Sequence, residues 1–202
     1  MILATGFEPF GGEAVNPSWQ AVQRLPDSVS GHLVLKARLP VVWYDALTVL
    51  EDLVNTHRPR ALLLCGQAGG ESHMRIERVG VNLCEAKIGD NKGRVLTGEP
   101  VVPGGPAAYL STFPYRDILR RIEGAGIPAR FSYSAGCYLC NHVLYGGLHL
   151  QATEYPAMNT GFIHVPYLPG QAVGKAAGTP SMALDTIVQA LTMALEAMAA
   201  EL

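Results

Sequence analysis

Two cysteines, Cys137 and Cys140, stand where an extended segment gives way to a helical pattern. A thiol at a helix N-terminus faces unpaired backbone N–H groups and the positive end of the helix dipole, which favour the thiolate and can stabilise an oxyanion. Cys140 is therefore a candidate nucleophile. The same letters also spell Cys-x-x-Cys, a redox or metal motif, and an inert buried cysteine is a third interpretation.

Two further residues could complete a catalytic set. His164 stands at the end of a short strand-like segment, where an imidazole can act as a base, although a single histidine is often structural. Glu77 lies in an apolar setting where burial is costly without a partner, and Arg75 or Arg78 could supply a structural salt bridge. A nucleophilic thiol works with an imidazole and with a group that orients the imidazole, so Cys140, His164 and Glu77 form one hypothesis.

Other kinds of site have weaker support. Cys65 and Cys84 do not form a second Cys-x-x-Cys, and His142 is poorly placed to join Cys140 in a zinc site on one helix. The paired glycines at 69–70 and 104–105 fit neither the Walker nor the dinucleotide-binding pattern. We expect no metal and no cofactor.

Two phenylalanines, Phe7 and Phe10, stand on either side of Pro9 in a glycine-rich segment. They are too apolar for a solvated turn. They either fill the core or form an aromatic wall for a ligand.

Strand and helix patterns alternate along the chain. Apolar runs predict strands over residues 1–5, 32–39, 61–66, 130–134 and 161–166, and helical spacing predicts helices over 17–25, 43–57, 115–123, 140–149 and 180–201. Asn16 is the expected N-cap of the first helix, extended segments fill 74–88, and a long loop covers 90–106. We predict an α/β fold, a single-domain twisted mixed β-sheet flanked by helices on both faces.

Composition narrows the partners. The 202 residues are 49% hydrophobic and 16% charged, with a formal charge of −2 and no basic cluster, so we expect neither nucleic acid nor a membrane as partner. From the first residues we expect no signal peptide, and from the lengths of the apolar runs we expect no membrane-spanning helix. Four cysteines without a signal predict a reducing, cytoplasmic location.

Four sequence blocks, taken in order, resemble those of the pyroglutamyl peptidase I family of cysteine peptidases. They are Gly6-Phe7-x-Pro9-Phe10-Gly11-Gly12 with Asn16-Pro17-Ser18, Gly66-Gln67-Ala68-Gly69 with Ile76-Glu77-Arg78-Val79-x-Val81-Asn82, Ser134-Ala135-Gly136-x-x-x-Cys140-Asn141, and Gly161-Phe162-Ile163-His164-Val165-Pro166. The resemblance covers almost the whole chain and implies one peptidase domain over residues 1–202.

The resemblance implies hydrolysis of the amide bond after an N-terminal pyroglutamyl residue of peptides and proteins. It assigns Cys140 as nucleophile, His164 as base and Glu77 as the group that orients the histidine. Six positions match the lining of the pyroglutamyl pocket: Phe7, Phe10, Gln67, Ile88, Tyr138 and Leu139. Three more are possible accessory residues: Asp90, Asn16 and Lys87. The resemblance also implies a homotetramer.

Several positions depart from the family pattern. Arg75 stands where a small hydroxyl residue is common, Gly80 replaces alanine, Gly89 replaces proline and Lys87 replaces arginine. Because the catalytic set is intact, these changes bear on rate and loop rigidity. Two other functions remain as alternatives, namely a redox protein that uses Cys137 and Cys140 and a pyroglutamyl-peptide binder without turnover.

Overall fold

A seven-stranded mixed sheet forms the centre of the computed structural model, which describes residues 1–202. Its spatial order is β10 (Ala129–Ser132), β5 (Met74–Glu77), β11 (Asn159–Val165), β4 (Ala61–Gln67), β1 (Ile2–Phe7), β3 (His32–Leu39) and β2 (Ser28–Val29). Neighbouring strands run parallel except β5 against β11 and β2 against β3. Because β2, β5 and β10 run against the other strands, the predicted mixed sheet is confirmed.

Side chains of the central strands point alternately into two separate cores. Ile2 and Leu63 point into one core, whereas Leu3, Leu62 and Leu64 point into the other. Every one of them is fully buried, as expected for strands covered on both faces. The prediction of a buried strand from the continuous apolar run of 61–66 is therefore confirmed.

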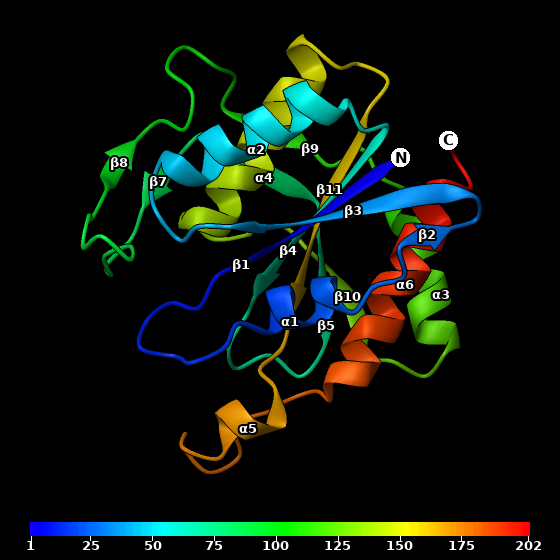
Figure 1. Cartoon of the computed structure of the whole chain (residues 1–202). Helices are drawn as coiled ribbons and strands as arrows, with labels where there is room; N and C mark the ends of the chain where they lie inside the picture. The colour runs from blue at the N-terminus through cyan, green and yellow to red at the C-terminus, as the bar shows by residue number, and fades with distance from the viewer.

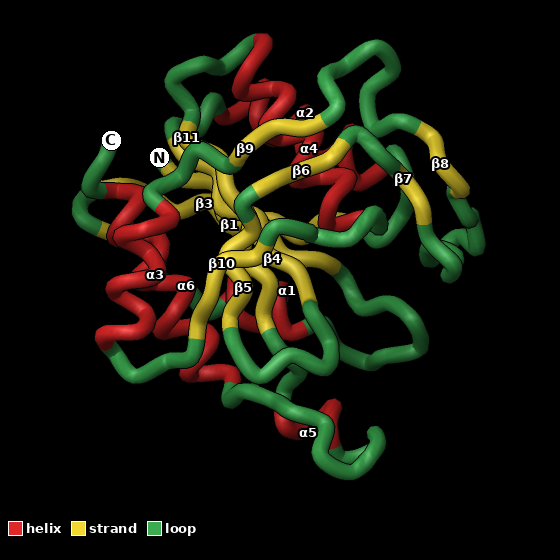
Figure 2. Tube along the Cα trace, turned by 180° about the vertical axis from the view of Figure 1, so that it is seen from behind, coloured by secondary structure: helices red, strands yellow, loops and turns green.

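Helices cover both faces of the sheet. The first core is closed by α1 (Pro17–Gln23), α3 (Tyr115–Gly124) and α6 (Leu184–Ala199), and the second by α2 (Asp45–His57) and α4 (Leu139–Thr153). Figure 1 shows the two groups on opposite sides of the strands, and Figure 2 shows the same layers from behind. None of the helices is long and apolar enough to cross a membrane.

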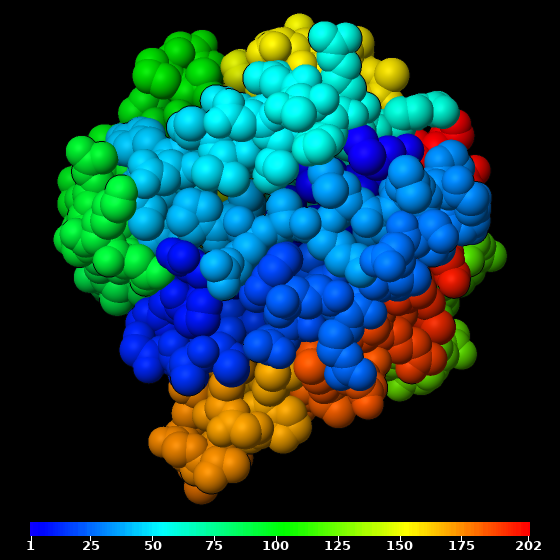
Figure 3. Space-filling view, viewed as in Figure 1, coloured from blue at the N-terminus to red at the C-terminus, as the bar shows by residue number.

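Smaller elements lie outside the sheet. Two short antiparallel strand pairs lie in the middle of the chain. They are β6 (Val79–Val81) with β9 (Ala108–Leu110), and β7 (Cys84–Glu85) with β8 (Thr97–Glu99). Helix α5 (Pro169–Ala172) belongs to the orange segment that projects from the molecule in Figure 3. The sequence patterns do not predict β2, β9 or α5, and β8 lies within the loop that they predict over 90–106.

The start of the last helix is predicted wrongly. Thr179 directly precedes the helix predicted over 180–201, but its hydroxyl donates to the carbonyl of Ala176 and does not cap that helix. The N–H of Met182 bonds to the carbonyl of Tyr167, which keeps this stretch outside the helix, and the helix begins at Leu184. The N-cap at Asn16 is confirmed, since its side chain accepts the N–H of Ser18 and Pro17 opens the helix.

Candidate active site

Cys140 lies in the first turn of α4. The helix begins at Leu139, and Tyr138, at the N-cap, makes no side-chain capping bond. The first N–H groups of a helix have no intrahelical acceptor, so those at the start of α4 are free to meet a negatively charged oxygen. The preceding strand ends at Ser132, two residues before the predicted end at 134, and a loop over 133–138 leads into the helix.

Glu77 and His164 meet on adjacent strands. His164 is near the end of β11 and Glu77 ends β5, its antiparallel neighbour. His164 Nδ1 lies 2.8 Å from Glu77 Oε1, and both residues are buried, Glu77 completely. A carboxylate in this position holds the imidazole in one orientation and stabilises its protonated form.

Cys140 completes the set. Burial alone would lower the pKa of His164, but the charge and hydrogen bond of Cys140, followed by the hydrogen bond and charge of Glu77, together raise it to about 9. An imidazole whose pKa is raised to about 9 stays protonated at neutral pH. The structure therefore brings Cys140, His164 and Glu77 together, although they come from a helix and two strands.

Gly66 makes this approach possible. It pairs with His164 across β4 and β11 and faces α4. A Cβ at this position would lie 2.7 Å from Cys140 Sγ and 2.7 Å from Phe162 Cζ, which is closer than real Cβ contacts. Glycine thus lets the strand pass beneath the thiol, because an added side chain would force Cys140 Sγ and the Phe162 ring to shift.

Arg75 is a further contact of the catalytic carboxylate. Its Nε lies 3.2 Å from Glu77 Oε1, the same oxygen that faces His164, so the carboxylate serves the imidazole and a salt bridge at once. Arg78, the other expected mate, instead places its guanidinium 3.2 Å from the ring centre of Tyr115. Glu77 Oε2 has no hydrogen-bond partner in the structure.

A narrow aromatic cavity adjoins Cys140. Eight residues line it: Phe7, Phe10, Asn16, Val41, Gln67, Tyr138, Leu139 and Cys140. Its volume of about 20 Å³ has room for about one water. Five of the six expected pocket residues and Asn16 are in this lining, and Val41 is an addition without any signal in the sequence.

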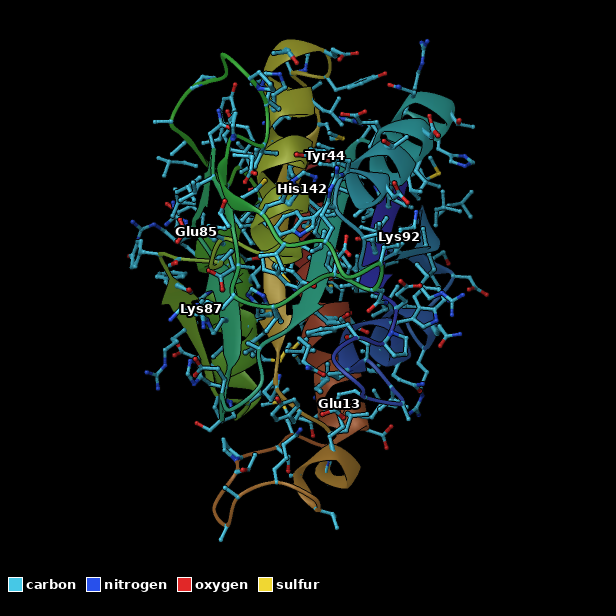
Figure 4. All side chains as sticks on the ribbon, turned by 90° about the vertical axis from the view of Figure 1, so that its left-hand side faces the viewer. Glu13, Tyr44, Glu85, Lys87, Lys92 and His142 are labelled. Atoms are coloured by element: carbon cyan, nitrogen blue, oxygen red, sulfur yellow. The ribbon has the colours of Figure 1, made fainter.

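The sixth expected residue, Ile88, lies elsewhere. It is exposed on the segment after β7, next to Lys87, which is also exposed and is labelled in Figure 4. This segment touches the cavity through a hydrogen bond from the Tyr138 hydroxyl to the carbonyl of Gly89, 3.0 Å long. Neither Ile88 nor Lys87 contacts the catalytic set in this structure.

Asp90 shapes the same segment. Its carboxylate accepts the backbone N–H groups of Trp43, Lys92 and Arg94, at 2.8–2.9 Å. Burial opposes the charged form, but these N–H groups lower the pKa of Asp90. The carboxylate thus ties the segment to the start of α2 and is not available to a substrate in this arrangement.

The glutamine in the cavity is held from a distant part of the chain. Gln67 Oε1 accepts a 2.9 Å hydrogen bond from Gln171 Nε2 of α5. Lys175 forms an ion pair with Glu13, labelled close to α5 in Figure 4, and fastens the same segment. Sequence reasoning missed Gln171, because no local pattern links residues so far apart.

Cys137 is set apart from the catalytic set. Its carbonyl accepts the N–H of Glu85, and burial together with the charge of Glu85 raises the pKa of its thiol. All four cysteines are free. No group of three or more His, Cys, Asp or Glu residues is arranged to hold a metal ion.

Comparisons with known proteins identify the family of the chain. The family model described as pyroglutamyl peptidase matches residues 1–201. The pyrrolidone-carboxylate peptidase of Thermosipho africanus is 46% identical over 99% of this chain and 97% of its own length, and that of Finegoldia magna is 44% identical over 97% and 92%.

Solved structures show the same likeness. Pyroglutamyl peptidase I from Bacillus amyloliquefaciens superposes with a TM-score of 0.94 at 43% identity, covering 98% of this chain and 96% of its own. A mutant pyrrolidone carboxyl peptidase from P. furiosus gives 0.95 at 42% identity, covering 100% and 99%. The chain belongs to the pyroglutamyl peptidase family.

Proposed function

We propose that this protein hydrolyses the amide bond after an N-terminal pyroglutamyl residue of peptides, using Cys140 as nucleophile within one peptidase domain that spans residues 1–202. The observation that carries the proposal is the contact of Cys140 with the His164–Glu77 pair beside an aromatic cavity. Family membership supports the same substrate class.

The pyroglutamyl group suits the cavity. Pyroglutamate is a neutral lactam without an ammonium group, so recognition depends on packing of its flat ring and on hydrogen bonds to its N–H and C=O. Phe7, Phe10 and Tyr138 supply apolar surface, and Gln67 supplies an amide whose oxygen is already held by Gln171. Because the cavity holds about 20 Å³, its walls must move apart to admit the ring.

The reaction follows from the positions of the groups. The Cys140 thiolate attacks the pyroglutamyl carbonyl carbon, and the resulting oxyanion meets the N–H groups at the start of α4. His164 donates its proton to the leaving amine as the C–N bond breaks, and the acyl group stays on the sulfur. Water then attacks the thioester while His164 accepts its proton, which frees pyroglutamate and restores the thiolate.

Release of a fluorescent amine from a pyroglutamyl amide tests the proposal. Cys140→Ala should abolish release, whereas Cys137→Ser, a matched change at the neighbouring cysteine, should keep most of it. Full activity of Cys140→Ala would overturn the mechanism. Loss of activity in Cys137→Ser would instead favour the redox alternative, and tight binding without release would favour a binder.

Assembly and location are also proposals. Following the family resemblance, we propose a homotetramer, which a sizing measurement of the purified protein tests. The free state of all four cysteines fits a reducing compartment such as the cytoplasm.

A further inference from the structure

A second, larger hollow lies beside the catalytic histidine. It has a volume of about 390 Å³ and is lined by Ala68, Gly69, Glu71, Arg75, Ser134, Ala135, Gly136 and His164. It shares no residue with the aromatic cavity, yet both are built from the same two stretches of chain. Gln67 and Leu139 line the cavity, and Ala68 and Gly136 line the hollow.

The cavity and the hollow adjoin different members of the catalytic set. Cys140 lines the cavity, so the pyroglutamyl carbonyl must reach it there, and His164 lines the hollow. The histidine can protonate the leaving nitrogen only within hydrogen-bond reach. The residue that carries that nitrogen therefore extends into the hollow, which is open to solvent and lets a peptide continue outward.

Arg75 is engaged by the groups around it in the hollow. Arg75 is shared by two carboxylates, because its Nη1 lies 3.1 Å from Glu71 Oε1 and its Nε lies 3.2 Å from Glu77 Oε1. Its Nη2 donates to Ser132 Oγ and to the carbonyl of Ser134. The guanidinium of Arg75 is thus engaged by these groups and is not offered to a substrate.

Glu71 carries the free acceptor. Its Oε2 has only a 3.6 Å approach to His73 Nε2, and its side chain is 33% exposed. Burial and the charge of Arg130 lower the pKa of His73, so this imidazole is neutral at neutral pH and does not compensate the carboxylate. Arg130 itself is exposed and lines the adjacent hollow, where solvent screens it.

We propose that this hollow binds the residue that follows pyroglutamate and that Glu71 makes it favour basic side chains over acidic ones. The proposal rests on the proposed function and names the substrate preference of the same site. Glu71 selects by charge, and it touches neither the scissile bond nor the thiol. Its effect is therefore on the relative rates of substrates and not on the reaction type.

Three C-terminally amidated dipeptides test the preference: pyroglutamyl-lysine, pyroglutamyl-glycine and pyroglutamyl-glutamate. Amidation removes the terminal carboxylate, so only the side chain differs in charge. We expect kcat/KM for the lysine substrate to exceed that for the glutamate substrate about fivefold, the size given by partly exposed charge contacts. The glycine substrate should fall between them.

Two variants and a salt titration test whether the charge of Glu71 causes the preference for lysine over glutamate. Glu71→Gln keeps the side-chain shape and should reduce the lysine-to-glutamate ratio to about one, with each rate normalised to the glycine substrate of the same variant. Asp52→Asn, the same loss of charge on exposed α2, should leave the fivefold ratio unchanged. In the unaltered protein, salt raised from about 0.05 M to about 0.5 M should also reduce the ratio.

The outcomes separate this inference from the proposed function. Release from all three substrates at equal rates, or a fivefold ratio that persists in Glu71→Gln, would overturn the inference and leave the proposed function standing. No release from any of the three would overturn the proposed function itself. If circular dichroism shows that Glu71→Gln does not fold, the salt titration decides, and a ratio that does not change with salt would overturn selection by charge.

Discussion

Gly66→Ala offers the sharpest test of the active-site geometry. The added Cβ would lie 2.7 Å from both Cys140 Sγ and Phe162 Cζ, whereas ordinary contacts begin near 3.4 Å. Each neighbour must therefore move by about 0.7 Å, or β4 must move away from both. The strand is held on both sides by β1 and β11, so the thiol is the part that yields.

The magnitudes follow from that displacement. Overpacking of a filled core costs about 1–3 kcal/mol. For a chain of this size, that loss lowers Tm by roughly 3–10 °C. A shift of about 1 Å in a reacting group can cost about 10²-fold in rate, so we expect kcat to fall about 10-fold to 10²-fold. The cavity walls change less, and KM should change less than kcat.

Amine-release kinetics and thermal unfolding of Gly66→Ala measure the expected losses in kcat and in Tm. Gly124→Ala is the matched control, because it adds the same methyl group at the end of α3, where nothing lies within 4 Å. The control should keep its activity and its Tm. If Gly66→Ala is as active and as stable as the unaltered protein, the close approach of β4 to the thiol does not constrain catalysis.

Three other predictions concern charge at the site. Because the pKa of His164 is raised to about 9, kcat/KM should decline as pH rises through that value. Loss of the same proton also removes the stabilising contact of His164 with Glu77. A decline of kcat/KM that begins below pH 7 would contradict this prediction. Glu77→Gln should lower kcat by about 10²-fold or more, with little change in KM, and should move the high-pH decline of kcat/KM to lower pH. If that decline does not move, Glu77 does not set the pKa of His164. Asp90→Ala removes the acceptor of three backbone N–H groups, so the free energy of unfolding measured by denaturant titration should fall by about 3 kcal/mol. In steady-state assays KM should rise, because Tyr138 loses its support from Gly89. Unchanged stability would refute this role of Asp90.

Local patterns predict most of the fold. The buried strands 61–66 and 161–166, the helix behind Cys140 and the cap at Asn16 are governed by residues close in sequence, and such signals can be read directly. The start of the last helix is missed because a tertiary contact, Met182 to Tyr167, holds the preceding residues extended. Short β2, β9 and α5 depend on their partners in the same way.

The site is predicted unevenly for the same reason. Residue type and family resemblance point to Cys140, His164 and Glu77, and the structure brings them together. Gln171 supports Gln67 from a position 104 residues away, which no local pattern encodes. The dual contact of Glu77, with His164 and with Arg75, likewise depends on the antiparallel register of β5 and β11.

The reversed direction of β5 arranges charges by depth. The segment that leads into it enters from the hollow, so Glu71 is 33% exposed, Arg75 is 23% exposed and Glu77 is fully buried, each in contact with the next. A charge that binds at the surface is therefore two ion pairs away from the carboxylate that orients His164. The carboxylate at the mouth of the hollow and the carboxylate that orients His164 thus belong to one chain of ion pairs through Arg75.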